Sequence, residues 1–422
     1  MKRLLLLIAS LALSISGLHA EEEEVFEYNA QFNPITGEGA NLAGIISPEI
    51  FVVPTGGVFG DGIGAADLAT TEHDPQNDFG IQVLEVHLDI NYKDVITGAV
   101  YGAGFQGNDE WEAALEEAYL HYHLNDWLAV GGGQFLNRVG FQSDKHVHGW
   151  DFVNQNLLNS RMLNEGELIT QGAEMVLTLP DWRSVITIGG GGVRTHAHAH
   201  EEGDEHGHEE EEHDHEMEIG HHDEDDHDEH EGEEHHLEAD DANFSDYVVS
   251  FDWRMGLPFD ESATLLTSFA TGENGFGRQT WVYGAGLEKI WGAHDHGDGP
   301  EFCEGAVMLR SEFMGRHIGI EDEDGERFDA NDYGFSTGLF YGLGETTTLS
   351  IRHDWVSDLD ELELEDRHRI SPALTFFLDK NQRIKTRLQY DYNTSDSLGE
   401  EHAAWLQFQV MWGGHGGAHH HH

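Results

Sequence analysis

The chain has almost no cysteine, little proline and no long hydrophobic run. Cys303 is its single cysteine, so no internal disulfide can form. The apolar run near the start is too short to cross a bilayer as a helix, and no later segment approaches the ~20 apolar residues that a crossing needs. Disulfide-stabilised folds and helical membrane proteins are therefore excluded.

Cations are also scarce. Only 21 Lys and Arg stand against 81 Asp and Glu, which gives a formal net charge of −60. Nucleic-acid phosphates would be repelled by such a charge, whereas metal cations would be attracted. The composition thus predicts no nucleic-acid partner and favours divalent metal ions as partners.

The N-terminus has the pattern of a secretory signal. Lys2 and Arg3 precede a short apolar stretch, and small residues end it at Ala20. We expect a signal peptide over residues 1–20 and a periplasmic N-terminal segment over 21–39.

What the chain does contain is repeated alternation of apolar and polar residues. In 383–391, alternate residues such as Leu388 and Tyr390 form an apolar face, and Arg387 and Gln389 lie on the polar face. A membrane β-barrel needs one face toward lipid and one toward water. Near Val83 the alternation slips once, which indicates a β-bulge. The repetition predicts an all-β, antiparallel transmembrane barrel.

The connections between the alternating segments support a barrel over 40–412. Short turns near 92–94, 125–126, 180–181, 258–260, 342–345 and 379–381 alternate with longer polar connections near 106–111, 136–168, 193–244, 317–330, 357–366 and 394–401. With a first strand within 40–53, this predicts sixteen strands with both termini on the periplasmic side. The long connection at 292–299 falls where a short turn is expected, so fourteen or eighteen strands also fit.

Residues 195–237 consist mainly of His, Asp, Glu and Gly and cannot form a packed core. We expect a disordered outer loop. Neutral imidazole binds Zn²⁺, Ni²⁺ and Cu²⁺, with carboxylates as further ligands. The candidate metal ligands are its histidines: His196, His198, His200, His206, His208, His213, His215, His221, His222, His227, His230, His235 and His236.

A second candidate metal site lies in the long connection after Phe135. His146, His148 and Asp151 are close in sequence and are flanked by Trp150 and Phe152, so this segment can pack. Long loops of large barrels often fold inward and narrow the pore. We therefore expect these three residues at a constriction; histidines bonded only to backbone or water would look the same in sequence.

The polar faces of two predicted strands supply a third candidate, a path of ligands along the lumen. It consists of Glu85, His87, Asp89, Glu117, His121 and His123. Basic residues are also predicted to face inward, and they leave the ion selectivity open: Arg310, Arg383, Lys385 and Arg387. The His-containing tail at 413–422 carries no weight in the assignment.

Several motifs between 115 and 180 resemble a family of outer-membrane barrels described as zinc-regulated receptors or porins that lack a plug domain. The matching stretches are Glu-Glu-Ala-Tyr at 116–119, Gly-Gly-Gln-Phe at 132–135, His-Val-His-Gly-Trp-Asp-Phe-Val at 146–153, Asn-Glu-Gly-Glu at 164–167, and 172–180. The resemblance implies a barrel without a plug, associated with zinc, in which His146, His148 and Asp151 are functional positions.

These observations favour an outer-membrane channel that captures divalent metal, above all zinc, on its His-rich outer loop and passes it to the periplasm by diffusion. Two alternatives remain: a surface protein that sequesters metal and uses a closed barrel as its anchor, and a general or anion-selective porin. We expect no enzyme, because no nucleophile motif such as Gly-x-Ser-x-Gly occurs. The expected partners are metal ions, outer-membrane lipid and further copies of the chain.

Overall fold

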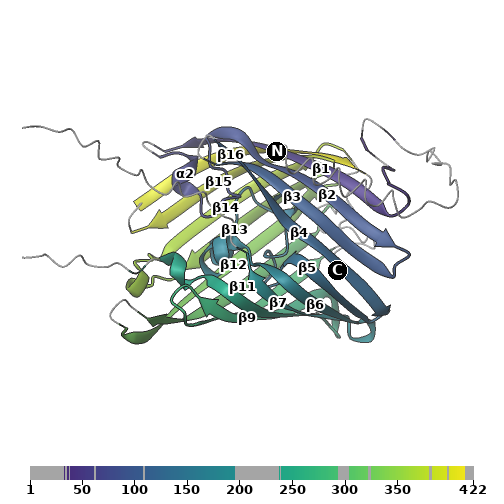
Figure 1. Cartoon of the computed structure of the whole chain (residues 1–422). Helices are drawn as coiled ribbons and strands as arrows, with labels where there is room; N and C mark the ends of the chain where they lie inside the picture. The colour runs from purple at the N-terminus through teal and green to yellow at the C-terminus, as the bar shows by residue number, and fades with distance from the viewer. Residues whose placement is uncertain are drawn as a thin grey trace, which may run out of the picture.

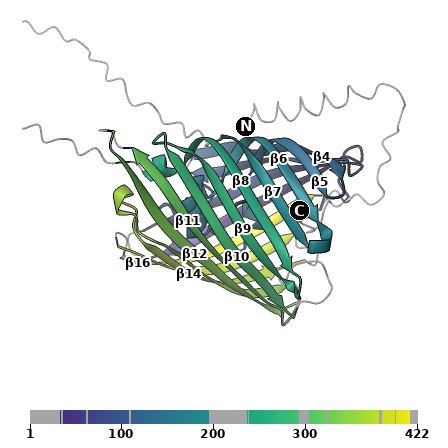
Figure 2. The same cartoon turned by 90° about the horizontal axis from the view of Figure 1, so that it is seen from below.

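The computed structural model is a closed antiparallel β-barrel of sixteen strands. Figures 1 and 2 show one continuous wall of tilted strands. The structure describes residues 33, 36, 37, 39–60, 63–107, 110–194, 237, 239–292, 304–321, 325–379, 383–396 and 399–413. The expected signal peptide, nearly all of the His-rich segment and the tail after Gly413 lie outside this range. The all-β barrel and its sixteen strands are confirmed.

Each strand pairs with its neighbours in the chain, and β1 pairs with β16 to close the wall. The strands are β1 Ile46–Phe59, β2 Phe79–Tyr92, β3 Ile96–Gly107, β4 Glu110–Asn125, β5 Leu128–Leu136, β6 Ile169–Leu179, β7 Ser184–Val193, β8 Phe244–Leu257, β9 Asp260–Asn274, β10 Gln279–Trp291, β11 Val307–Glu321, β12 Arg327–Gly344, β13 Thr347–Val356, β14 Arg367–Phe377, β15 Ile384–Ser395 and β16 Gly399–Gly413. The first strand lies further along the chain than the predicted 40–53. Closure leaves no open strand edge, as a lipid environment requires.

The two ends of the barrel differ in their connections. At one end, here the short-turn end, β2–β3, β4–β5, β6–β7, β8–β9, β12–β13 and β14–β15 are joined by short connections. The connection between β10 and β11 is long and also joins its strands at this end. It is the connection that left fourteen or eighteen strands open, and the count is nevertheless sixteen. The opposite, long-loop end carries 60–78, 137–168 and 194–243. Three connections predicted to be long there, at 106–111, 317–330 and 394–401, are short, because their strands continue into residues that were assigned to loops from their polarity.

The alternation predicted from the sequence is present along the strands. On β15, Leu388 and Tyr390 are exposed on the outer surface, whereas Arg387, Gln389 and Asp391 are buried inside. The predicted bulge is found beside Val83, where the β1–β2 register shifts between Val53 and Pro54. An apolar outer face and a polar inner face are what a lipid-embedded barrel needs.

Short helices occur only in the connections, among the described residues: α2 Ala65–Leu68, η1 Val147–Gly149, α3 Leu157–Met162, η2 Asn164–Gly166, η3 Pro180–Trp182, η4 Ala239–Ala242 and η6 Asp360–Leu362. Within the described part of the chain, no helix has the length and apolar character to span a membrane.

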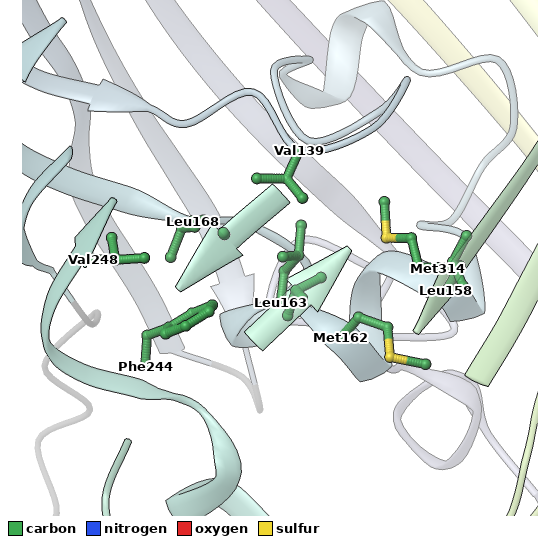
Figure 3. Close-up of a cluster of buried hydrophobic side chains, with 10 residues drawn as sticks. Val139, Leu158, Met162, Leu163, Leu168, Phe244, Val248 and Met314 are labelled. Carbon is green, nitrogen blue, oxygen red and sulfur yellow. The ribbon is translucent and has the colours of Figure 1, made fainter. Parts of the chain in front are cut away.

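Residues 137–168, here the inserted segment, fold into the barrel as predicted. Their apolar side chains, including Leu158 and Met162 of α3, pack against the inner wall at Phe244 and Val248 of β8 and Met314 of β11 (Figure 3). Leu158 is fully buried, so truncation to Ala would cost about 2–5 kcal/mol. This packing fixes where the segment lies in the lumen.

Gly140 allows the segment to approach the wall closely. Its φ is +99°, and a Cβ there would lie 2.3 Å from Oε1 of Glu312 and 2.4 Å from Cε of Met314. The backbone conformation favours glycine at this position, and a larger residue would also displace the ends of the Glu312 and Met314 side chains.

The outer surface generates a first prediction. Leu406 lies at the middle of β16 and is 40% exposed on the apolar face. Leu406→Arg should lower the free energy of unfolding in lipid vesicles by about 2–4 kcal/mol, because a charge at the bilayer midplane is costly. Urea titration of the barrel in vesicles measures the change.

The matched control is Val58→Arg, near the end of β1. Near the bilayer surface the same charge should cost only about 0–1 kcal/mol. Equal losses at the two positions would contradict a lipid-facing outer surface.

Candidate functional site

Buried cations on β13, β14 and β15 hold the inserted segment across the lumen. Arg352 donates to the carbonyl oxygen of Asn154 at 3.0 Å, and Arg369 donates to that of Gln155 at 2.9 Å. Charge-assisted hydrogen bonds of this kind are among the stronger ones in proteins. Two of the predicted inward cations act in the same way: Lys385 donates to the His148 carbonyl at 3.0 Å and Arg387 to the Trp150 carbonyl at 2.8 Å.

Asp151 belongs to this cationic side. Its Oδ2 atom lies 2.5 Å from Nη1 of Arg310 on β11 and 3.6 Å from Nζ of Lys145. Burial alone would raise its pKa, but Lys145 and Arg310 hold the pKa of this carboxyl well below its usual range. The structure therefore does not bring Asp151 together with His146 and His148. Arg383, predicted to face inward, is buried.

Across the lumen from these cations, His146 of the inserted segment lies between two consecutive glutamates of β4. Nδ1 of His146 lies 2.6 Å from Oε2 of Glu116, and Nε2 lies 3.0 Å from Oε2 of Glu117. Neighbouring residues on a strand normally point to opposite faces. Here the β3–β4 register shifts between Tyr101 and Gly102, which leaves Glu116 as an extra residue, and both carboxylates face the lumen.

His148 lies beside two residues of β2, Glu85 and His87. Its Nδ1 lies 2.5 Å from Oε2 of Glu85, and Nε2 of His87 lies 3.2 Å from the same oxygen. Within the described part of the chain, Glu85, His87 and His148 are the one group of at least three His, Cys, Asp or Glu side chains whose ligand atoms lie close enough together to hold a metal ion. Burial and the nearby His87 and His146 lower the pKa of His148 to about 4, although Glu85 opposes this shift, so its imidazole is neutral.

The remaining predicted lumen residues continue this wall toward the short-turn end. The Tyr101 hydroxyl donates to Asp89 at 2.9 Å. Nε2 of His121 lies 2.9 Å from Oε1 of Glu174 on β6. Nε2 of His123 lies 2.8 Å from the Thr97 hydroxyl.

At the long-loop end, the same wall begins beside a cavity of about 270 Å³. Four carboxylates line it, from Glu72, Glu167, Asp240 and Asp241, together with Arg194. Arg194 directly precedes the His-rich segment, and 239–242 follow it closely in sequence. The cavity thus lies where the chain enters and leaves that segment.

His73 links this cavity to the wall. Its Nε2 lies 2.9 Å from Oε1 of Glu116, the residue that also contacts His146. Burial lowers the pKa of His73, but Glu167, Glu116 and Glu72 more than offset this and raise it to about 10. Burial, with Glu116 and Glu117 nearby, raises the pKa of Glu167 to about 7 despite His73 and His146. His73 is therefore charged at neutral pH.

Comparison with known proteins yields no matching family model and no matching curated protein. Solved structures do match. The outer membrane channel DcaP of Acinetobacter baumannii has a TM-score of 0.52 at 9% identity, over 87% of this chain and 96% of that one. Salmonella typhi OmpF, in complex with daunomycin, has a TM-score of 0.51 at 9% identity, over 87% and 97%. The anion-selective porin of Comamonas acidovorans has a TM-score of 0.50 at 9% identity, over 87% and 99%.

The chain has the fold of outer-membrane porins. Identities this low bear on the fold alone, so the barrel implied by the family resemblance is supported and its link to zinc stays a prediction. Inside this barrel the inserted segment separates a wall of acids and histidines from a wall of anchoring cations.

Several residues of the wall of acids and histidines were not predicted from the sequence. Strict alternation from Glu117 would place Glu116 on the outer face, but the bulge turns it toward the lumen. His73 and Glu72 lie in a connection without periodicity, so no signal marked them. Glu167 stands in one of the motifs that carry the family resemblance, which was a usable signal, but no role was drawn from it.

The anchoring of the inserted segment generates a second prediction. Arg369 is fully buried and also donates to Oδ1 of Asn393 at 2.9 Å. Arg369→Met should lower the free energy of unfolding by about 3 kcal/mol, because two acceptors lose their charged donor. It should also raise the conductance in planar bilayers, because the segment is less firmly held.

The control is Arg327→Gln, which removes an exposed arginine paired with Glu321. Exposed ion pairs contribute about 0–1 kcal/mol. Indistinguishable stability and conductance in the two variants would refute the anchoring role.

His73 generates a third prediction. Because its pKa is raised from 6.5 to about 10, its charge stabilises the fold fully below pH 6.5, and this contribution is lost as pH rises through 10. The difference in unfolding free energy between wild type and His73→Gln should therefore be largest at pH 5–6.5 and shrink toward pH 10. Urea titrations across this range measure it; a difference that stays constant would contradict the charged state.

Proposed function

We propose that the protein is an outer-membrane channel for divalent metal ions, with zinc as its main cargo. One observation carries the proposal: histidines and carboxylates follow one another along a single lumen wall, from the acidic cavity at the long-loop end to His123 near the short-turn end. Imidazole and carboxylate together are ligands that suit Zn²⁺. A series of moderate sites lets an ion enter and also leave, which conduction requires.

The location follows from the outer surface. Leucine, valine and aromatic side chains are exposed around the barrel, among them Leu349, Leu406 and Val410. Such a surface is stable in lipid and would aggregate in water. We infer the bacterial outer membrane, with the long-loop end and the His-rich segment outside the cell and the short turns in the periplasm.

Capture would begin on the His-rich segment. Its thirteen histidines and many carboxylates offer weak, quickly exchanging sites, which raise the local concentration of Zn²⁺ beside the cavity. Carboxylates of Glu72, Asp240 and Asp241 then attract the ion to the mouth. No catalytic group is needed, because the ion moves down its gradient.

A specific observation favours a second candidate. Glu85, His87 and His146 are nearly fully buried under the inserted segment. A barrel that stays closed at this point would hold metal without conducting it, and the protein would then sequester metal at the cell surface. An anion-selective porin fits less well, because Lys385 and Arg387 donate to backbone carbonyls of the inserted segment.

The fourth prediction separates these functions. Wild-type barrel in liposomes should admit Zn²⁺ to an enclosed zinc-sensitive dye. A variant with Gln at all thirteen histidines of 195–237 keeps the length and acidity of the segment and should admit micromolar Zn²⁺ about tenfold more slowly, because local enrichment is lost. Its K⁺ conductance should equal that of wild type.

A barrel that neither conducts K⁺ nor admits Zn²⁺ would overturn the channel and favour sequestration. Equal zinc entry in both proteins would refute capture by the histidines.

A further inference from the structure

We infer that Glu85, His87 and His148 form a discrete zinc site that clasps the inserted segment to β2. This inference rests on the proposed function for the choice of metal, and it adds a defined ligand set and a structural role. Two of the ligands come from the barrel wall and one from the inserted segment, so a bound ion would join the two.

The three ligand atoms lie within 4.8 Å of one another, and two of their separations can be compared with those around a tetrahedral ion. Zinc lies about 2.0–2.2 Å from His nitrogen and carboxylate oxygen, so two ligand atoms in a tetrahedron are about 3.3 Å apart. Oε2 of Glu85 lies 3.2 Å from Nε2 of His87. The same oxygen lies 2.5 Å from Nδ1 of His148, so a relative shift of about 0.8 Å between these two side chains makes room for zinc.

The second observation concerns a buried polar atom of His87. Its side chain is 3% exposed, and among the described residues Nε2 approaches Oε2 of Glu85 at 3.2 Å without a well-aligned hydrogen bond. A buried polar atom without a partner costs about 1–3 kcal/mol. Coordination to a metal ion would satisfy this atom.

The surroundings hold the ligands in place. The ring of Phe51 stacks on that of His148, with centroids 4.0 Å apart, and Tyr101 packs against His87 at 4.1 Å. The backbone N–H of His148 donates to Oε1 of Glu85 at 3.3 Å, and Lys385 holds its carbonyl. Supporting contacts that fix ligand orientation are typical of real metal sites.

The ligand types favour zinc over other cations. Two imidazoles and one carboxylate are the set that open, three-ligand zinc sites use, whereas Ca²⁺ and Mg²⁺ prefer oxygen ligands alone. The fourth position would stay open for water or for a passing ligand. The His146 ring lies beside the site, with its centroid 5.5 Å from that of His87.

The fifth prediction tests the site directly. Crystals of the full chain soaked in zinc chloride should give an anomalous difference peak at the zinc edge, about 2.0–2.2 Å from the three ligand atoms. His148→Gln and Glu85→Gln should lose this peak. His353→Gln, which removes a histidine on the outer face, should retain it.

Zinc should also raise the urea midpoint of wild type and of His353→Gln, because binding links the inserted segment to the wall. The shift should be absent in His87→Gln, which tests the site in solution through another ligand. No peak at the three residues, a peak only elsewhere, or an unchanged zinc shift in His87→Gln would overturn the inference.

The outcomes also distinguish this site from the proposed channel. A peak at the three residues in a barrel that admits no zinc to liposomes supports the site and overturns the channel. Zinc entry without the peak overturns the site and leaves the channel standing.

Discussion

The inserted segment is held across the lumen by buried cations that donate to its backbone carbonyls, and the rest of the site depends on this anchoring. Arg352 and Arg369 fix 154–155, and the fixed segment in turn presents His146 and His148 to the opposite wall. Asn154 and Gln155 are buried, and a buried backbone carbonyl needs a hydrogen-bond donor. The same hydrogen bonds therefore satisfy the backbone carbonyls of the segment and orient its histidines.

This anchoring explains a charge pattern that is ambiguous in the sequence. Lysines and arginines on the polar faces of strands suggest an anion path when they are considered alone. Lys385 and Arg387 donate to backbone carbonyls of the segment and keep their charge, whereas the acids and histidines across the lumen lie against one another and beside an acidic cavity. The asymmetry favours cations on one side of the lumen.

The sequence predicts the barrel well because alternation records a local property, the side of the wall that each residue faces. Leu388 beside Arg387 is one such pair, and the repetition of this pattern along the chain predicts the strands and the faces of their residues. Bulges break this rule, so alternation alone does not predict that Glu116 and Glu117 both face the lumen. Asp151 was grouped with His146 and His148 from sequence proximity, yet it turns toward Arg310, a residue far along the chain. The hydrogen bond between Glu85 and His148 likewise joins two segments that are distant in sequence, and no local pattern predicts that they lie side by side.

In the proposed channel, the wall of acids and histidines determines which ions pass. The most direct measurement is the reversal potential of the wild-type barrel in a planar bilayer under a gradient of zinc chloride. A potential of the sign set by Zn²⁺ moving down its gradient is the expected result. A potential of the opposite sign, carried by chloride, would show that the anchoring cations govern permeation and would contradict the account.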